Sequence, residues 1–361
     1  MGIEKTTLEN TERAYRIINE CSADSQHYLS LGEENRYFFG TEIFGAISYV
    51  LAGKKAMSLG DPVCKFKDIE RFIGEYINFC NKMGYKPIFN SVSSDVAEIL
   101  RTYNYSVIKY GEEAVLKLAE YTLAGGQKAV LRHNVNKVNK SGVTLQEYCP
   151  KNGRDYFLEG EISELADQWF ADKRFKLNYS VGNLHFDKPY ERRYFVTKDK
   201  DGNLLTILSF LPYEGGNGFC IDVMYRKLDA PTGVMEHALI SAIMKMKNEG
   251  ANEVSLGLAP LAGIDVTKPD VSRAEKLMNA VFHNMNFGYD FKNLHRFKKK
   301  FDPTTWKPRY LAYHRGISLV DLAIAITNTK RGSADIGLYV KYKVFIISFT
   351  IFPGLYSARN K

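Results

Sequence analysis

The sequence of 361 residues lacks the features that mark several common classes of protein. Its five cysteines are odd in number, widely scattered and free of CxxC spacing, which argues against a disulfide framework and a zinc site and fits a reducing cytoplasm. It has no Walker A loop, GxSxG elbow, HExxH motif or Rossmann glycine fingerprint. We therefore expect neither a metal nor a cofactor.

Segments that would enter or cross a membrane are also lacking. The N-terminus, MGIEKTTLEN, has no apolar core of a signal peptide. Residues 344–352 are apolar but far shorter than the roughly twenty residues that a membrane-spanning helix needs. The sequence therefore predicts a soluble, cytoplasmic chain that meets the inner face of a membrane only peripherally.

The composition that is present is that of an ordinary globular protein with an excess of positive charge. A hydrophobic share of 45% and a charged share of 25% are typical of globular domains, and the length is comfortable for two of them. The formal charge of +8 favours an anionic partner, namely nucleic acid or an acidic membrane surface. The 23 Tyr and 22 Phe suit either an aromatic-lined cavity or two packed cores.

Residues 218–265 organise the second half of the chain. Residues 219–224 are expected to form a strand, and Pro231 is expected to open a helix. A second, buried strand follows at residues 253–258. This order predicts a crossover connection and hence a partly parallel sheet. Asp222 lies near the end of the first strand, where open α/β sheets bind ligands, and it is the first candidate for chemistry.

The first half of the chain repeats this order of elements. A break at residues 60–62 precedes a helix with apolar periodicity at residues 66–83. A strand, a short helix and a strand then follow at residues 87–92, 94–102 and 105–109. The sequence identity between the halves is negligible, so the order of elements alone predicts an α/β fold with two copies of one unit.

Two segments carry clustered positive charge. Residues 128–140 contain four Lys or Arg and no acid, and a solvated outer face explains this as well as a binding face does. Residues 291–315 contain eight Lys or Arg against the single Asp302. So many like charges on one short helix repel one another unless an anion such as phosphate lies opposite them. The second segment therefore predicts a phosphate-binding site.

Five motifs in order along the chain carry a resemblance to a known family. They are LGDPV (59–63), LRHNVNKVNKSG (131–142), IDVMYRKLDAPTGVME (221–236), LGLAPLAG (256–263), and FKNLHRFKKKF with WKPRYLAY (291–313). With these motifs the chain resembles the cytosolic catalytic domain of the multiple-peptide-resistance family, whose members are aminoacyl-phosphatidylglycerol synthases. The resemblance implies an α/β fold of tandem acetyltransferase-like (GNAT) domains with mixed sheets.

The resemblance also implies a division of the chain into four segments. These are an N-terminal GNAT-like domain at 1–125, a basic connecting helix and linker at 126–190, a C-terminal GNAT-like catalytic domain at 191–330, and an apolar tail at 331–361. The tail would pack on the body of the protein or on the membrane surface. Usual members also carry a large flippase of many membrane helices, which this sequence does not contain. Either a separate flippase works with the chain or the chain is an excised domain.

The activity implied by the resemblance is an aminoacyl transfer. An aminoacyl group, lysine or alanine, would move from aminoacyl-tRNA to the hydroxyl of phosphatidylglycerol or a related polar lipid at an anionic membrane surface. This exchange of one ester for another needs no ATP and no metal. Two alternatives stay open: transfer to the amine of a peptide or peptidoglycan precursor, and a non-catalytic module that binds tRNA or lipid.

The site residues implied by the resemblance include two departures from the family pattern. In the family, an Asp at the end of the central strand is followed three residues later by an Arg. Asp222 matches, but Tyr225 occupies the Arg position, so Asp222 and the nearest guanidinium, that of Arg226, are the expected catalytic groups. His295 stands where a second Arg is common. The expected substrate-binding cations are Arg132, Lys292, Arg296, Lys298 and Lys299.

Overall fold

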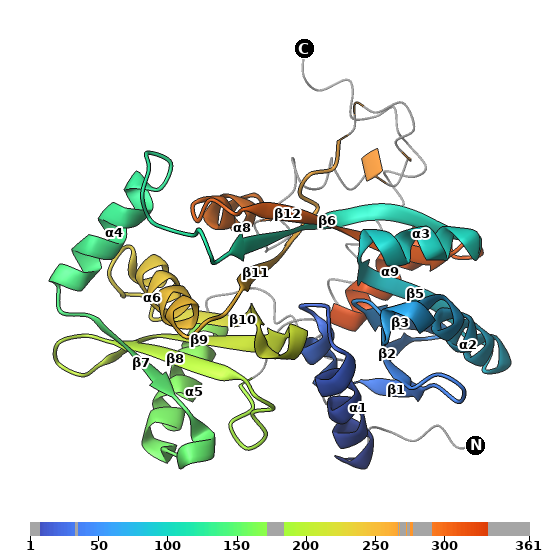
Figure 1. Cartoon of the computed structure of the whole chain (residues 1–361), viewed down its shortest axis with the longest axis horizontal. Coiled ribbons are helices and arrows are strands. Elements are labelled where there is room, and N and C mark those ends of the chain that lie inside the picture. The colour runs from blue at the N-terminus through green and yellow to red at the C-terminus, as the bar shows by residue number, and fades with distance from the viewer. Residues whose placement is uncertain are drawn as a thin grey trace.

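The computed structural model in Figure 1 describes residues 8–32, 35–171, 184–265, 267, 272, 275–276 and 291–330. In this view the N-terminal elements gather on the right and helices α4, α5 and α6 lie on the left. The apolar tail expected at residues 331–361 lies outside the described residues.

The elements of the first half agree closely with the periodicity of the sequence. In order they are α1 (Leu8–Cys21), η1 (His27–Leu31), β1 (Arg36–Phe39), β2 (Gly45–Ala52), β3 (Lys55–Leu59), β4 (Val63–Cys64), η2 (Phe66–Asp68), α2 (Ile69–Lys82), β5 (Lys86–Val92), α3 (Ser94–Thr102) and β6 (Tyr105–Lys117). The strand expected at residues 105–109 is therefore longer than predicted.

The described elements of the second half begin with a basic helix. In order they are α4 (Ala129–Lys140), β7 (Thr144–Tyr148), η3 (Pro150–Asn152), α5 (Tyr156–Ala171), β8 (Arg193–Lys198), β9 (Leu204–Tyr213), η4 (Glu214–Gly216), β10 (Gly218–Arg226), α6 (Val234–Asn248), β11 (Glu253–Pro260), α8 (Phe291–Lys299), β12 (Thr305–His314) and α9 (Leu319–Lys330). None of the helices in the described ranges is both long and apolar enough to cross a membrane.

The described strands form one mixed sheet of 12 strands. Their order is β1-β2-β3-β5-β12-β6-β11-β10-β9-β8-β7, with β4 paired to β2. β3 pairs with β5, and β10 with β11, in parallel, whereas the other pairs are antiparallel. The predicted partly parallel sheet is therefore confirmed, and each half contributes one parallel pair joined by a crossover helix, α2 or α6.

The long strands β6 and β12 join the two halves (Figure 1). β12, from the end of the second half, lies between β5 and β6 of the first half. β6, from the end of the first half, lies between β12 and β11. The pairing of β6 with β12 runs from Tyr105↔His314 to Val115↔Thr305. Each half thus receives a strand from the other.

Both crossover helices form because apolar side chains recur at helical spacing. In α2 the side chains of Phe72, Ile73, Tyr76 and Cys80 are buried, and they pack on aromatic residues of the neighbouring strands. α6 is buried over most of its surface because it lies between the sheet and α4. The described aromatic residues largely fill these cores, as in the tilted and edge-on stacking of Tyr76 with its neighbours.

Strands β8, β9 and β12 were not predicted from the sequence. All ten residues of β9 are buried, and such a continuous apolar run lacks the alternation that distinguishes a strand. β12 contains Pro308, which argues against a central strand because proline cannot donate to the ladder. Proline is tolerated here because β5 pairs only with Tyr310–Tyr313, so Pro308 lies beyond the end of β5.

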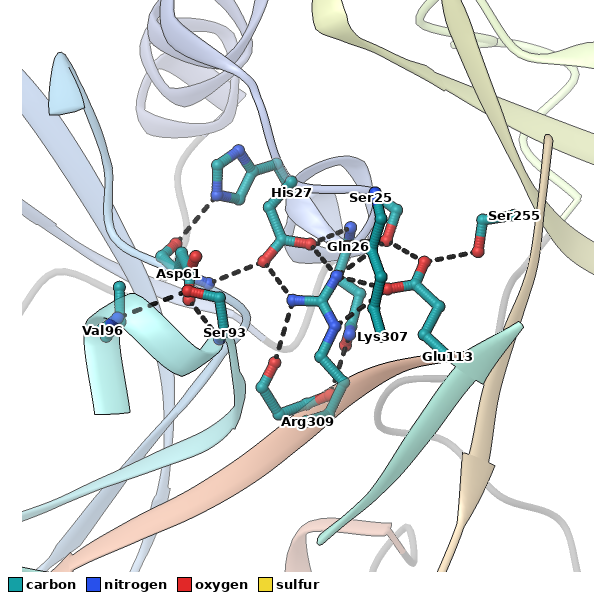
Figure 2. A network of polar contacts seen from close by, with 12 residues as sticks. Ser25, Gln26, His27, Asp61, Ser93, Val96, Glu113, Ser255, Lys307 and Arg309 are labelled. Carbon is teal, nitrogen blue, oxygen red and sulfur yellow. Dashed lines mark hydrogen bonds and ion pairs between the residues drawn. The ribbon is translucent and has the colours of Figure 1, made fainter. Parts of the chain in front are cut away.

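A buried ion cluster holds β12 in its place (Figure 2). The guanidinium of Arg309 in β12 donates to both carboxylate oxygens of Asp24, at 2.8 and 2.9 Å. It also donates through Nε to Glu113 of β6 at 2.8 Å. All three side chains are at most 6% exposed. Glu113 in turn accepts from Ser255 of β11, so the cluster connects the segment after α1 with β12, β6 and β11.

The charges of this cluster compensate one another. Burial alone would raise the pKa of Asp24, but the guanidinium of Arg309 and the ring of His27 outweigh it, and the pKa is lowered. The backbone N–H of Asp61, from the LGDPV motif, donates to Oδ2 of Asp24 at 3.1 Å, and the Asp61 carboxylate accepts from the backbone N–H of Ser93 at 2.8 Å. Burial and the Asp24 charge therefore raise the pKa of Asp61 to about 7.

We expect Arg309→Met to lower the free energy of unfolding by about 3–5 kcal/mol, because two buried carboxylates lose their counter-ion. Chemical denaturation measures this change. The matched control is Arg101→Met, which removes an exposed pair with Glu98 and should change stability by about 1 kcal/mol at most. Equal stability of the two variants would show that the cluster does not hold β12.

Candidate active site

The parallel strands β10 and β11 are paired only over their first three residues and then separate. They pair only at Gly218–Cys220 with Glu253–Ser255. Directly beyond this point, the register of β10 against β9 shifts between Ile221 and Val223, and that of β11 against β6 shifts between Ser255 and Leu258. Bulges of this kind re-aim side chains and are frequent beside active sites. We call the opening between the two strands the fork.

Asp222 occupies the bulge of β10 at the fork. Its side chain is completely buried. Ser209 of β9 donates to Oδ2 at 3.3 Å. The Nε of Arg192, which directly precedes β8, lies 3.8 Å from Oδ2, too far for a hydrogen bond. Strand pairing, not sequence proximity, brings these three residues together.

This buried pair has unused hydrogen-bonding capacity. In the described part of the protein, Oδ1 of Asp222 and both Nε and Nη1 of Arg192 have no hydrogen-bond partner. Buried polar groups are rarely left without partners, because the loss of hydration is then uncompensated. The pair therefore suits a ligand that donates to the carboxylate and accepts from the guanidinium.

Burial sets the protonation behaviour of Asp222. Removal from water raises its pKa to about 6, although Arg192 and the Ser209 hydroxyl lower it in part. The phenol of Tyr225 is also buried, and its pKa is raised by burial first and then by the Asp222 charge. Tyr225 packs against Trp169 and Phe170 of α5. Tyr225 thus lies between Asp222 and the aromatic rings of α5 in this chain of contacts, and the pKa of about 6 leaves Asp222 ionised at neutral pH.

The sequence of this site can now be compared with known proteins. The model of the family described as "Phosphatidylglycerol lysyltransferase, C-terminal" matches residues 15–313. The chain belongs to this family. The resemblance noted in the sequence is confirmed, and the match includes both halves of the sheet and the fork.

Individual relatives carry the same description. The phosphatidylglycerol lysyltransferase of Bacillus subtilis is 26% identical over 310 residues, which are 85% of this chain and 35% of the relative. That of Staphylococcus epidermidis is 24% identical over 317 residues, 87% of this chain and 37% of the relative. The chain thus spans about a third of the length of the curated relatives it matches.

Solved structures of family members share the fold. The structure of L-PGS from Bacillus licheniformis superposes with a TM-score of 0.78 at 24% identity, covering 91% of this chain and 97% of that one. A C-terminal domain from Agrobacterium fabrum superposes with a TM-score of 0.74 at 24% identity, covering 89% and 95%. The predicted α/β fold with a mixed sheet is confirmed.

Arg226 does not take the place of the family arginine at Asp222. Its Nη1 donates to the carbonyls of Lys227 at 3.1 Å and Leu228 at 3.4 Å, so it braces its own loop. Among the described residues, the cation paired with Asp222 is Arg192. The sequence offered one signal for this residue: it is the first of two adjacent arginines. Its neighbour Arg193 bonds Glu147 and Glu249 instead.

The basic helices place their expected ligand-binding cations in different surroundings. In α4, Arg132 donates to the carbonyls of Leu123 and Gly125 and so holds the preceding loop. In α8, Arg296 and Lys299 are exposed and Lys292 is half-buried. Lys298 differs from the others because its side chain is buried. Burial therefore sets Lys298 apart from the exposed cations of α8.

No metal centre accompanies these residues in the described part of the chain. The described residues include no group of three or more His, Cys, Asp or Glu side chains that could hold a metal ion. The described cysteines are all free thiols.

We expect Asp222→Asn to remove a specific pH dependence of stability. The pKa of Asp222 is about 6 in the folded protein and about 3.9 in an unfolded chain. The favourable contribution of the protonated form is thus complete below about pH 4 and lost as the pH rises through 6. Relative to the variant, the wild type should lose roughly 2 kcal/mol of stability between pH 4 and 7.

Denaturation curves at several pH values measure this difference. Asp201→Asn, which changes an exposed turn residue, serves as the control and should leave a constant offset from the wild type. Parallel stability profiles for the wild type and Asp222→Asn would contradict the assigned burial of the carboxylate.

Proposed function

We propose that this chain transfers an aminoacyl group, lysine or alanine, from aminoacyl-tRNA to a hydroxyl of phosphatidylglycerol or a related polar lipid. The observation that carries the proposal is the half-satisfied pair of Asp222 and Arg192. The α-ammonium of an aminoacyl ester can donate to Oδ1 of Asp222, and the ester carbonyl can accept from Arg192. One reactant thereby satisfies both buried groups.

The chemistry of this transfer matches the groups at the fork. An aminoacyl-tRNA is already an activated ester, so the enzyme has to position two reactants and move a proton. Asp222 is ionised at neutral pH and can hold an ammonium group. We propose that the packed rings of Tyr225, Trp169 and Phe170 shield the bound ester from water. Neither a nucleotide cofactor nor a metal is required.

The family description supports the lipid as acceptor and lysine as the amino acid. Tyr225 in place of the family arginine changes the wall beside Asp222, so alanine stays a second candidate. The charge of +8 suits both a tRNA and an anionic bilayer. We propose that the chain works at the inner face of the membrane and that a flippase moves the charged product.

The exposed cations of α8 are the proposed phosphate contacts. Arg296 and Lys299 lie on the outer side of the helix, and Lys292 lies one turn before Arg296. Arg132 of α4 shapes the loop that precedes it and is a second candidate for contact with lipid or RNA phosphate. Two alternative functions are tested alongside this one: transfer to the amine of a peptide or peptidoglycan precursor, and binding of tRNA or lipid without transfer.

A transfer assay with radiolabelled lysyl- and alanyl-tRNA and phosphatidylglycerol vesicles tests the proposal. We expect label in the organic phase. Asp222→Asn and Arg192→Met should each lower the rate by at least about 100-fold with the fold intact, because they remove the contacts that position the ester. Arg226→Met is the matched control and should retain most of the activity.

The assay also distinguishes the rivals. Label on an added peptide or peptidoglycan precursor, and none in lipid, would identify an amine acceptor. Binding of tRNA without any transfer would identify a non-catalytic module. Full activity of Asp222→Asn would show that this carboxylate is structural.

We expect the double variant Arg296→Ala/Lys299→Ala to weaken tRNA binding and to flatten its salt dependence. Each phosphate contact contributes about 0.7–0.9 to the slope of log K against log salt, so the slope should fall by about 1.5. Filter binding at several salt concentrations measures the slope. Lys67→Ala/Lys82→Ala, which changes two exposed lysines of the other half, is the control. Unchanged tRNA binding with lost flotation on anionic vesicles would assign α8 to the membrane.

A further inference from the structure

Lys298 of α8 projects its amine into the fork between β10 and β11. Its side chain is 4% exposed. The Nζ donates to the carbonyl of Leu258 at 2.6 Å. It also lies 3.6 Å from the position that a Cβ on Gly257 would take, and the Ile221 carbonyl lies 3.8 Å from the same point. The amine is therefore placed where the two strands separate, between the bulge of β10 and that of β11.

The backbone of β11 is shaped to admit this amine. Gly257 has a φ of +74°, a left-handed conformation that side-chain-bearing residues rarely adopt. It lies within the stretch where the register of β11 against β6 shifts. The bulge turns the Leu258 carbonyl toward Lys298, and this bond uses one of the three donor positions of an ammonium group.

The groups that face Lys298 do not supply a counter-ion. Cys220 of β10 and Glu113 of β6 are the neighbouring acids, and His295 and Lys299 are its titratable neighbours on α8 itself. Glu113 is already bonded to Arg309, Ser25 and Ser255. The salt bridges of the described residues include none with Lys298. A buried ammonium without a counter-ion is strongly disfavoured.

In this environment the Lys298 amine can lose its proton at physiological pH. Burial lowers the pKa of Lys298 to about 7, and Cys220 and Glu113 only partly oppose it. Asp222 and Lys298 both act on the buried thiol of Cys220: burial raises the pKa of Cys220 to about 12, the charge of Asp222 adds to this rise, and the charge of Lys298 opposes it. The fork thus holds a carboxylate for an ammonium group and, nearby, an amine able to accept a proton.

We propose that Lys298 is the general base of the transfer and takes the proton from the acceptor hydroxyl. This inference rests on the proposed function. The hydroxyl O–H bond breaks as its proton passes to Nζ, and the oxygen attacks the carbonyl carbon of the aminoacyl ester. The bond from that carbon to the ribose oxygen of the tRNA then breaks. The Lys298 ammonium returns the proton to the departing ribose oxygen, so the step balances without a further reactant.

Two variants separate proton transfer from charge and from packing. Lys298→Arg keeps the positive charge but cannot act as a base near neutral pH, because a guanidinium does not lose its proton. Lys298→Met keeps the length of the side chain without charge. Both should lower kcat/KM by at least about 100-fold and leave the Kd for aminoacyl-tRNA within twofold. Lys82→Met, at the exposed end of α2 and outside the site, should keep wild-type kcat/KM.

The dependence of kcat/KM on pH distinguishes a general base from a lysine with a purely structural role. Wild-type kcat/KM should rise with pH through about 7 and then level off, because the base acts when it is neutral. The ionisation of Asp222 adds an inflection near pH 6. The residual activity of Lys298→Arg should keep the Asp222 inflection and lose the one near 7. Wild-type activity of Lys298→Arg would overturn the proposal, because charge alone would then suffice.

A direct titration of the Lys298 amine tests the proposal without relying on aminoacyl transfer. The protein is labelled with ¹³C at the lysine Cε, and the Lys298 signal is assigned by its loss in Lys298→Arg. We expect a titration midpoint of the Lys298 amine near pH 7. A midpoint near 10 would overturn the assignment of Lys298 as the base. This test holds even if Lys298→Met fails to fold. Transfer with a midpoint near 10 refutes only this inference. Absence of transfer to any acceptor refutes the proposed function and, with it, this step.

Discussion

The buried guanidinium of Arg309 is the constraint on which the shared sheet depends. β12 carries this charge into the middle of a sheet, where an unpaired ion is strongly disfavoured. Asp24 and Glu113 meet it from two other segments, so the charge is compensated only when β12 lies between β5 and β6. The exchange of strands between the halves and the ion cluster therefore require each other (Figure 2).

The same cluster shapes the electrostatics of the fork. Glu113 faces both Arg309 and the neighbourhood of Lys298, and its bonds to Arg309 leave the lysine without a carboxylate partner. Asp222 is buried on the other strand with only a distant arginine. A carboxylate with a raised pKa and an amine with a lowered one thus lie at one opening, a pattern typical of sites that bind and move charge.

Much of the fold was predictable because local periodicity reports which face of an element is buried. The helices α2, α3 and α4 and the strands β3, β5 and β10 begin and end within a few residues of their predicted bounds. The strand, helix and strand of residues 219–258 predicted the parallel pair β10–β11, whereas the parallel pair β3–β5 emerged only from the structure. Strands β8, β9 and β12 were missed because a fully buried run, or one with Pro308, lacks the alternating pattern of a strand.

The sequence by itself determined the family, the α/β class and the candidacy of Asp222, because motifs and element ends are local properties. Only the tertiary structure decided which cation meets Asp222: it is Arg192, 30 residues earlier, and not the adjacent Arg226. Only it separated buried Lys298 from exposed Lys299 in one basic run. The sequence gives two neighbouring lysines of a helix the same charge. How far each amine is removed from water depends on which other parts of the fold pack against it.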